Sequence, residues 1–105
     1  MSETMEVIYQ ELVYWVADTA PEGWLKTHIN MEVGFEDEEI VQSWLITCFM
    51  PEDQTTSYQA SEDKEIELMD HFLDIYEYHA KREEGWSICD FTVTKNGEYE
   101  VGYNT

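Results

Sequence analysis

Basic residues are scarce in this sequence. It contains 5 Lys and Arg against 24 Asp and Glu, which gives a formal net charge of −19 over 105 residues. Nucleic acids and anionic membranes both attract Lys and Arg, so this balance argues against either as a direct partner. It favours a basic protein partner, because strong negative charge steers cationic molecules toward the surface. Solubility or a halophilic source would also account for the charge.

Cysteines and long apolar runs are also few. The two cysteines, Cys48 and Cys89, lie in apolar, strand-like stretches, which indicates buried reduced thiols rather than a disulfide framework. No uninterrupted apolar stretch approaches the ~20 residues that span a bilayer. The start, M-S-E-T-M-E, is acidic, whereas a signal peptide needs a basic region before an apolar run. These absences predict a cytoplasmic protein without membrane contact.

Apolar and aromatic residues are plentiful despite the charge. Hydrophobic residues make up 43% of the chain, with four Trp, seven Tyr and four Phe. That content is too apolar for a disordered acidic tail, and the length suffices for one hydrophobic core. We therefore expect residues 1–105 to form a single domain.

The spacing of apolar residues predicts two helices. One spans residues 3–18, with Ser2 or Thr4 as its N-cap, and its apolar residues recur at three- and four-residue intervals. The other spans residues 61–83, with Ser61 as its N-cap. The apolar faces comprise Met5, Ile8, Leu12, Trp15 and Val16 on the first helix, and Met69, Phe72, Leu73, Tyr76 and Ala80 on the second, extended by Leu68 and Ile75.

The remaining segments predict strands. Residues 24–33 alternate between apolar and polar side chains, as in a half-buried strand. Residues 40–50 break this alternation, so we expect that strand to lie centrally with both faces partly covered. A short strand at residues 55–59 and a hairpin of residues 86–94 and 98–103 complete the set. The prediction is an α+β fold: an antiparallel sheet of four to five strands with two helices on one face, in the order α-β-β-(β)-α-β-β.

The turn K-N-G at residues 95–97 sets the register of the last hairpin. A two-residue Asn-Gly turn would place Val93 opposite Glu100, an apolar side chain against a charged one. A three-residue loop with Gly97 in the left-handed conformation places Val93 opposite Tyr99 and keeps the apolar side chains on one face. We therefore predict a type I turn with a bulge.

Catalytic and metal-binding signatures are missing from the sequence. It has no Gly-rich phosphate loop, no G-x-S-x-G elbow and no H-E-x-x-H pair. The three histidines, His28, His71 and His79, are scattered without zinc-like spacing to cysteine. We expect no enzyme activity, no metal and no cofactor. Paired carboxylates among so many acids keep an enzyme or small-ligand binder as a third possibility.

One run of acids lies where a binding site is most plausible. The stretch G-F-E-D-E-E joins two predicted strands, so its four carboxylates occupy a hairpin tip, and the nearest base in sequence is Lys26. The acidic face of the second helix is a further candidate, although a solvated face explains it as simply. The predicted partner-binding residues are Glu36, Asp37, Glu38, Glu39, Glu52 and Asp53, with Glu67, Asp70, Asp74 and Glu77 as secondary candidates.

The C-terminal segment G-W-S-I-C-D-F-T-V-T-K-N-G-E-Y-E-V-G-Y-N-T, residues 85–105, resembles the ending of the YezG-like immunity proteins, the antitoxins of bacterial polymorphic toxins. A Trp follows the second helix, then an alternating strand, a turn with Gly, and a strand ending in Tyr-Asn. The order of the predicted elements along the chain is also similar. The resemblance implies an α+β domain that binds and inactivates a cognate toxin, often a nuclease, in the cytoplasm.

Physical chemistry independently makes a nuclease a reasonable partner. A nuclease binds polyanions, so its active cleft is basic, and a small acidic domain is attracted to such a cleft by electrostatic steering. The alternative is a DNA-mimic inhibitor aimed at a host nucleic-acid-binding protein rather than a toxin. The sequence does not separate these two partners.

Overall fold

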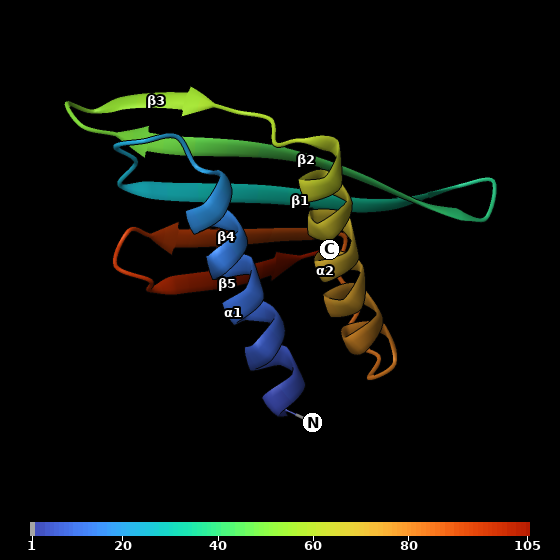
Figure 1. Cartoon of the computed structure of the whole chain (residues 1–105). Coiled ribbons are helices and arrows are strands. Elements are labelled where there is room, and N and C mark those ends of the chain that lie inside the picture. Colours follow the sequence, from blue (N-terminus) through green and yellow to red (C-terminus); the bar gives the residue numbers. More distant parts are fainter. Residues whose placement is uncertain (1) are drawn as a thin grey trace.

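The computed structural model describes residues 2–105, with side chains from Met5 onward. Within these residues the predicted α+β class, element order and single antiparallel sheet are confirmed. The strand order is β3-β2-β1-β4-β5, and both helices lie on one face of the sheet (Figure 1). Neither helix is both long and apolar enough to cross a membrane. The bounds are Ser2–Thr19 for α1, Lys26–Glu36 for β1, Glu39–Met50 for β2, Gln54–Ser57 for β3, Glu62–Ala80 for α2, Ile88–Thr94 for β4 and Tyr99–Asn104 for β5.

The core lies between the helices and the sheet. The alternation predicted for β1 is confirmed, since the side chains from Thr27 to Val33 that share one parity are buried. Phe72 of α2 meets Phe91 of β4 edge to face, with ring centroids 6.5 Å apart. Burying a side chain of this size contributes roughly 1.5–3 kcal/mol, so these contacts fix the helices against the sheet.

Helix α1 buries the predicted apolar stripe from Met5 to Val16. The indole Nε1 of Trp15 donates a hydrogen bond to the backbone oxygen of Lys64 at 2.7 Å, and this bond joins α1 to the first turn of α2. The two predicted N-caps of α1, Ser2 and Thr4, have side chains outside the described residues.

Helix α2 begins as predicted but ends early. The side chain of Ser61 accepts a hydrogen bond from the backbone N–H of Lys64, so the predicted N-cap is confirmed. The helix stops at Ala80 rather than near residue 83. Glu83 adopts a left-handed conformation with φ of 59°, and the next residue donates its N–H back to the oxygen of His79, which turns the chain before Gly85 is reached.

The fully buried residues of α2 all belong to the predicted face, but they lie toward one edge of it. Because α2 packs against α1 as well as the sheet, the side chains at the centre of the predicted stripe are only partly covered and Ala80 is exposed. The fully buried residues of α2 are Leu68, Phe72 and Ile75.

Strand β2 does not lie at the centre of the sheet, and this prediction was wrong. The central strand is β1, which pairs with β2 on one side and β4 on the other. Strand β3 pairs only with residues 47–50 of β2, and β4 pairs with β1 only as far as Glu32. The strands β1 and β2 therefore continue alone as a two-stranded ribbon, residues 33–42, called the arm here. Figure 1 shows the arm projecting past α2 at the right.

The predicted turn between β4 and β5 is confirmed. Val93 lies opposite Tyr99, and Gly97 has a φ of 91°. The N–H of Gly97 donates to the oxygen of Thr94 at 2.9 Å, which closes the turn.

Replacing Gly97 with Ala should destabilise the fold by about 1–2 kcal/mol, the penalty for an L-residue in the left-handed region. An added Cβ would meet no atom within 4 Å, so the cost is conformational rather than steric. Urea unfolding measures it. The control is Gly102→Ala in β5, where the Cβ is equally free and φ is not positive. Equal stability of the two variants would contradict the assigned turn.

Candidate protein-binding surface

The tip of the arm is a two-residue turn made of acids. Asp37 and Glu38 have φ of 51° and 67°, and both values are positive as a type I′ hairpin turn requires. Glu36 and Glu39 form the closing pair of the two strands. All four side chains are exposed, so the predicted position of this cluster at a hairpin tip is confirmed.

Acidic residues are energetically unfavourable in the backbone conformation of this turn. Type I′ turns favour Asn-Gly, and an L-residue in the left-handed region costs roughly 1–2 kcal/mol. Directly opposed like charges, here Glu36 and Glu39, are also destabilising. The turn after β2 has the same character, with Glu52 and Asp53 at φ of 65° and 58°. Both turns therefore retain carboxylates where glycine or asparagine would give a more stable fold.

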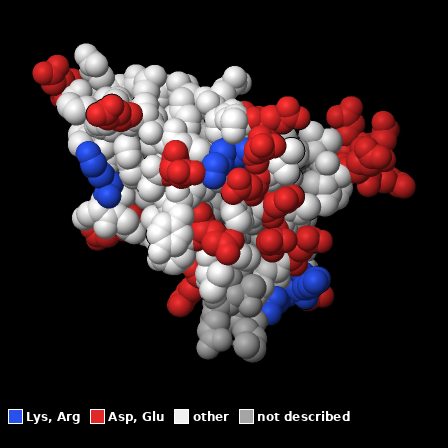
Figure 2. Space-filling view, in the orientation of Figure 1, with Lys and Arg blue, Asp and Glu red and all other residues white. Residues whose placement is uncertain are grey.

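No cation within residues 2–105 neutralises the tip. The ion pairs of these residues are His28–Asp90, Lys64–Asp18, Lys64–Glu67 and His71–Glu11, and none includes a tip residue. Figure 2 shows the tip as a dense group of carboxylates at the right end of the molecule, without Lys or Arg beside it.

The six primary candidates do not form one surface. Glu52 and Asp53 lie at the opposite end of β2 from the tip, and the 12 residues of β2 separate the two turns by roughly 35 Å at about 3.3 Å per residue. The structure thus places one group at each end of β2, not a single acidic site.

The secondary candidates lie on α2 near the base of the arm. Glu67, Asp70, Asp74 and Glu77 are all exposed and follow one face of the helix. Glu67 is 3.6 Å from the Nζ atom of Lys64, which is closer to Asp18. The arm is held beside this helix because Gln42 Nε2 donates to the backbone oxygen of Met69 at 3.1 Å. The tip and this acidic row therefore belong to the same end of the molecule.

The arm also exposes apolar side chains, which sequence reasoning missed. Phe35 and Ile40 lie opposite each other across the two strands and are 64% and 41% exposed. The ring of Phe35 contacts Tyr76 of α2, with centroids 6.3 Å apart, while Val41 is exposed on the other face of the ribbon. Apolar residues bordered by charge are typical of a protein interface. A two-residue turn at residues 37 and 38 would have predicted this pair, because that turn places Phe35 opposite Ile40.

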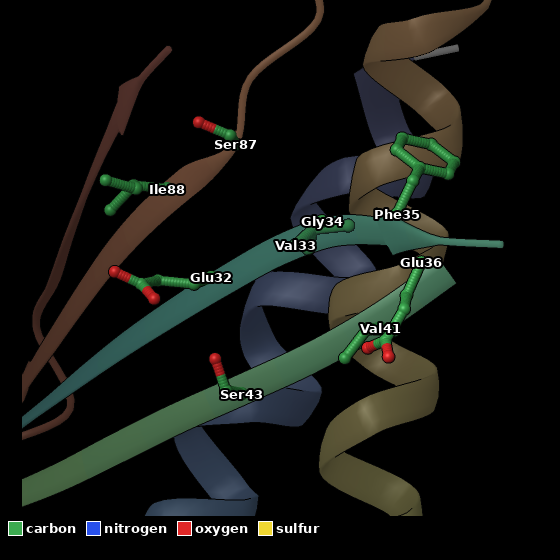
Figure 3. Close-up of a pocket in the computed structure, with 9 residues that line it drawn as sticks. All are labelled: Glu32, Val33, Gly34, Phe35, Glu36, Val41, Ser43, Ser87 and Ile88. Atoms are coloured by element: carbon green, nitrogen blue, oxygen red, sulfur yellow. The ribbon is translucent and has the colours of Figure 1, made fainter. Parts of the chain in front are cut away.

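A hollow of about 390 Å³ lies at the base of the arm, on the sheet face that the helices leave open (Figure 3). Its polar side chains are the carboxylates of Glu32 and Glu36 and the hydroxyls of Ser43 and Ser87. No Lys, Arg or His lines it. The hollow therefore suits a cationic group better than an anionic one.

Reactive groups elsewhere in the described residues are buried or structurally engaged. Cys48 and Cys89 are free and buried, on strands that flank β1. Cys48 pairs with Thr27 and Cys89 with Met31. Two strand spacings and an offset of four residues along β1 therefore separate the cysteines, which is beyond the reach of a disulfide. Burial raises the pKa of Cys89 to about 12, so its thiol stays protonated at neutral pH and is a poor nucleophile. Among the side chains described, from Met5 onward, no group of three His, Cys, Asp or Glu could hold a metal ion.

A histidine–carboxylate pair on the open sheet face was not foreseen. His28 Nε2 lies 2.8 Å from Asp90 Oδ1, and Asn30 Nδ2 donates to the same oxygen at 2.9 Å. The three residues come from neighbouring strands of one face, so their polar groups satisfy one another across the sheet.

Comparison with known proteins finds no matching family model and no matching curated protein. The candidate binding surface therefore consists of three features of the chain itself: the acidic tip, the acidic row on α2 and the apolar side chains of the arm.

Proposed function

We propose that this chain is an inhibitor that binds a cationic protein, and that its partner is a toxin with nuclease activity. The main support is the arm tip, where four exposed carboxylates are retained in a strained, self-repelling turn. Backbone strain that persists at a projecting loop points to a role for the residues that cause it. The resemblance of residues 85–105 to the YezG-like immunity proteins implies the same class of partner.

The electrostatics of the arm suit the cleft of a nuclease. Such a cleft holds Lys and Arg to bind phosphates, and a slender ribbon ending in carboxylates presents negative charge as a nucleic-acid strand does. Binding would relieve the repulsion between Glu36 and Glu39 by supplying the cations that the chain lacks. Long-range attraction would also speed association, which suits the rapid capture of a toxin in the cytoplasm.

The apolar side chains of the arm give this proposal a second support. Charged contacts at an exposed rim contribute roughly 0.2–1 kcal/mol each, so affinity needs an apolar centre as well. Phe35 and Ile40 supply one directly behind the tip. The proposed interface is therefore an acidic tip that orients the partner and an apolar pair that is buried against it.

A DNA-mimic inhibitor of a host nucleic-acid-binding protein is the second candidate. It is favoured by the acidic row on α2, where Glu67, Asp70, Asp74 and Glu77 recur at three- and four-residue intervals. Neighbours at this spacing are roughly 5–6 Å apart on a helix surface. Such a regular line of negative charge is one way to imitate a phosphate backbone.

The test is affinity purification of the tagged chain from its native host, with identification of the retained protein. We expect a protein whose expression alone arrests growth, and whose nuclease activity this chain abolishes in the purified complex. A retained DNA-binding protein without toxicity would favour the mimic. Retention of no protein at physiological salt would contradict both candidates.

A further inference from the structure

Strand β2 has an open edge along the arm. Residues 39–46 pair with β1 on one side, and within residues 2–105 no strand pairs with them on the other. The N–H of Val33 donates to Ser87 at 2.8 Å, so this residue of β1 directs its backbone groups toward the β4 side. Because such groups alternate along antiparallel strands, Ile40, Gln42 and Trp44 carry their N–H and C=O groups on the open edge of β2.

This edge lacks the usual protection against pairing. Natural edge strands carry charged residues, prolines or bulges that discourage the addition of another strand. The run from Ile40 to Met50 has no charged residue, although 28% of the chain is charged. The edge is also flanked by exposed apolar side chains, including Val41 and Leu45 at 43% and 58%. The opposite edge of the sheet, β5, carries Glu100.

We propose that an extended cationic segment of the partner adds to the sheet as a strand beside β2. Its backbone would hydrogen-bond to Ile40, Gln42 and Trp44, in the manner of peptide-binding sheet edges. The inference rests on the proposed function in taking the partner to be cationic, and it names where and how that partner binds.

The two ends of the edge identify the occupant. At one end the edge reaches the carboxylates of Glu38 and Glu39, which require positive side chains on the added strand. At the other end it reaches a hollow of about 330 Å³ between Leu45 and Tyr58, where β3 leaves the sheet, and this hollow accepts a side chain. A second copy of the chain fits poorly, because it would bring together two molecules of net charge −19.

A pair of synthetic peptides separates strand addition from attraction between charges. One has seven residues with alternating Arg and Val. The other has the same sequence with N-methyl groups on two adjacent central residues, which blocks both of its edges while preserving its charge. We expect the first peptide alone to slow hydrogen exchange at the amides of Ile40, Gln42 and Trp44, and to bind about tenfold tighter than the second.

The outcomes distinguish this inference from the proposed function. Equal binding of both peptides, with NMR shifts confined to the tip and α2, would overturn strand addition and leave a cationic partner intact. Slower hydrogen exchange at the amides of β5 instead of β2 would show that the peptide adds to the opposite edge, and would overturn the choice of β2. Slow exchange at β2 in the free chain, caused by dimerisation, would make a second copy the occupant. Failure of both peptides to bind at low salt would contradict the cationic partner itself.

A pair of variants tests the same edge on the protein side. Ile40→Pro and Ile40→Ala both remove an exposed side chain, but only proline removes the outward N–H group. Proline is tolerated where that group faces solvent on an edge strand, so circular dichroism should show both variants folded. We expect the proline variant to bind the unmethylated peptide about tenfold more weakly than the alanine variant. Equal affinities would contradict the proposed hydrogen bonding.

Discussion

Replacing Asp37 with Asn and Glu38 with Gly should stabilise the folded chain and weaken its binding to the partner. Asn-Gly is the preferred pair for a type I′ turn, whereas the native acids hold φ of 51° and 67°. Relief of the left-handed strain is worth roughly 1–2 kcal/mol. For a domain of this size each kcal/mol raises the Tm by about 4–8 °C. Thermal and urea unfolding measure the gain.

Two matched variants separate strain from charge and position. Asp37→Asn with Glu38→Gln removes the same two charges but leaves a side chain at the second left-handed position, so it should gain less stability. Glu52→Asn with Asp53→Gly relieves similar strain at the far end of β2, so it should gain stability without losing affinity. Equal stability of the two tip variants would contradict the strain argument. Equal loss of affinity at both turns would mean that the tip contributes only charge.

A variant that is more stable but binds less tightly is expected when a site is selected for recognition rather than for stability. The variant with Asn-Gly in the turn tests directly whether stability and binding are in conflict at this site. If stability rises and affinity is unchanged, Asp37 and Glu38 contribute neither to stability nor to binding. The proposed interface would then have to rest on the apolar pair of the arm.

Local rules were sufficient to predict most of the elements and one complete register. The loop at residues 95–97 was predictable because only one register keeps Val93 beside another apolar side chain. Ser61 was predictable as a cap because its hydroxyl lies next to the first unpaired N–H groups of α2. Both predictions depend only on residues that are close to one another in the sequence.

The arm was not predictable in the same way. Its existence depends on where β3 and β4 stop pairing, and those limits are set by long-range contacts rather than by residues 33–42 themselves. The exposure of Phe35 follows from these limits. An apolar side chain in a strand is expected to be buried in the core, unless it is known that no neighbouring strand covers it. The fully buried residues of α2 lie toward one edge of the predicted face for the same reason, since packing against α1 moved the centre of burial to Phe72 and its neighbours.

Neutralising the whole tip should impair the partner complex more than neutralising the same number of acids on α2. The first variant changes Glu36, Glu38 and Glu39 to Gln and Asp37 to Asn. The second changes Glu67 and Glu77 to Gln and Asp70 and Asp74 to Asn. Both raise the net charge by the same amount, so both should lose long-range steering and associate more slowly at low salt.

Dissociation distinguishes the two surfaces. Exposed ion pairs contribute roughly 0.2–1 kcal/mol each, so losing several at once should raise the dissociation rate about tenfold or more for the tip variant. The α2 variant should dissociate like the native chain, because the proposed interface is the tip and not the helix. It should also stay folded, since Asp18, which pairs with Lys64 at 2.7 Å, is unchanged and fewer like charges repel one another along the helix. Surface plasmon resonance against the purified partner at two salt concentrations measures both rates.

The pattern of dissociation and association rates assigns the role of the four acids at the tip of the arm. Faster dissociation of the tip variant alone, together with loss of protection against the toxin, makes Glu36 to Glu39 contact residues. Equal effects confined to association would mean that the tip and the α2 row both act only through the field of a highly acidic molecule. Faster dissociation of the α2 variant alone would move the interface to the helix, and the strained turn would then need another explanation, since the partner would not contact it.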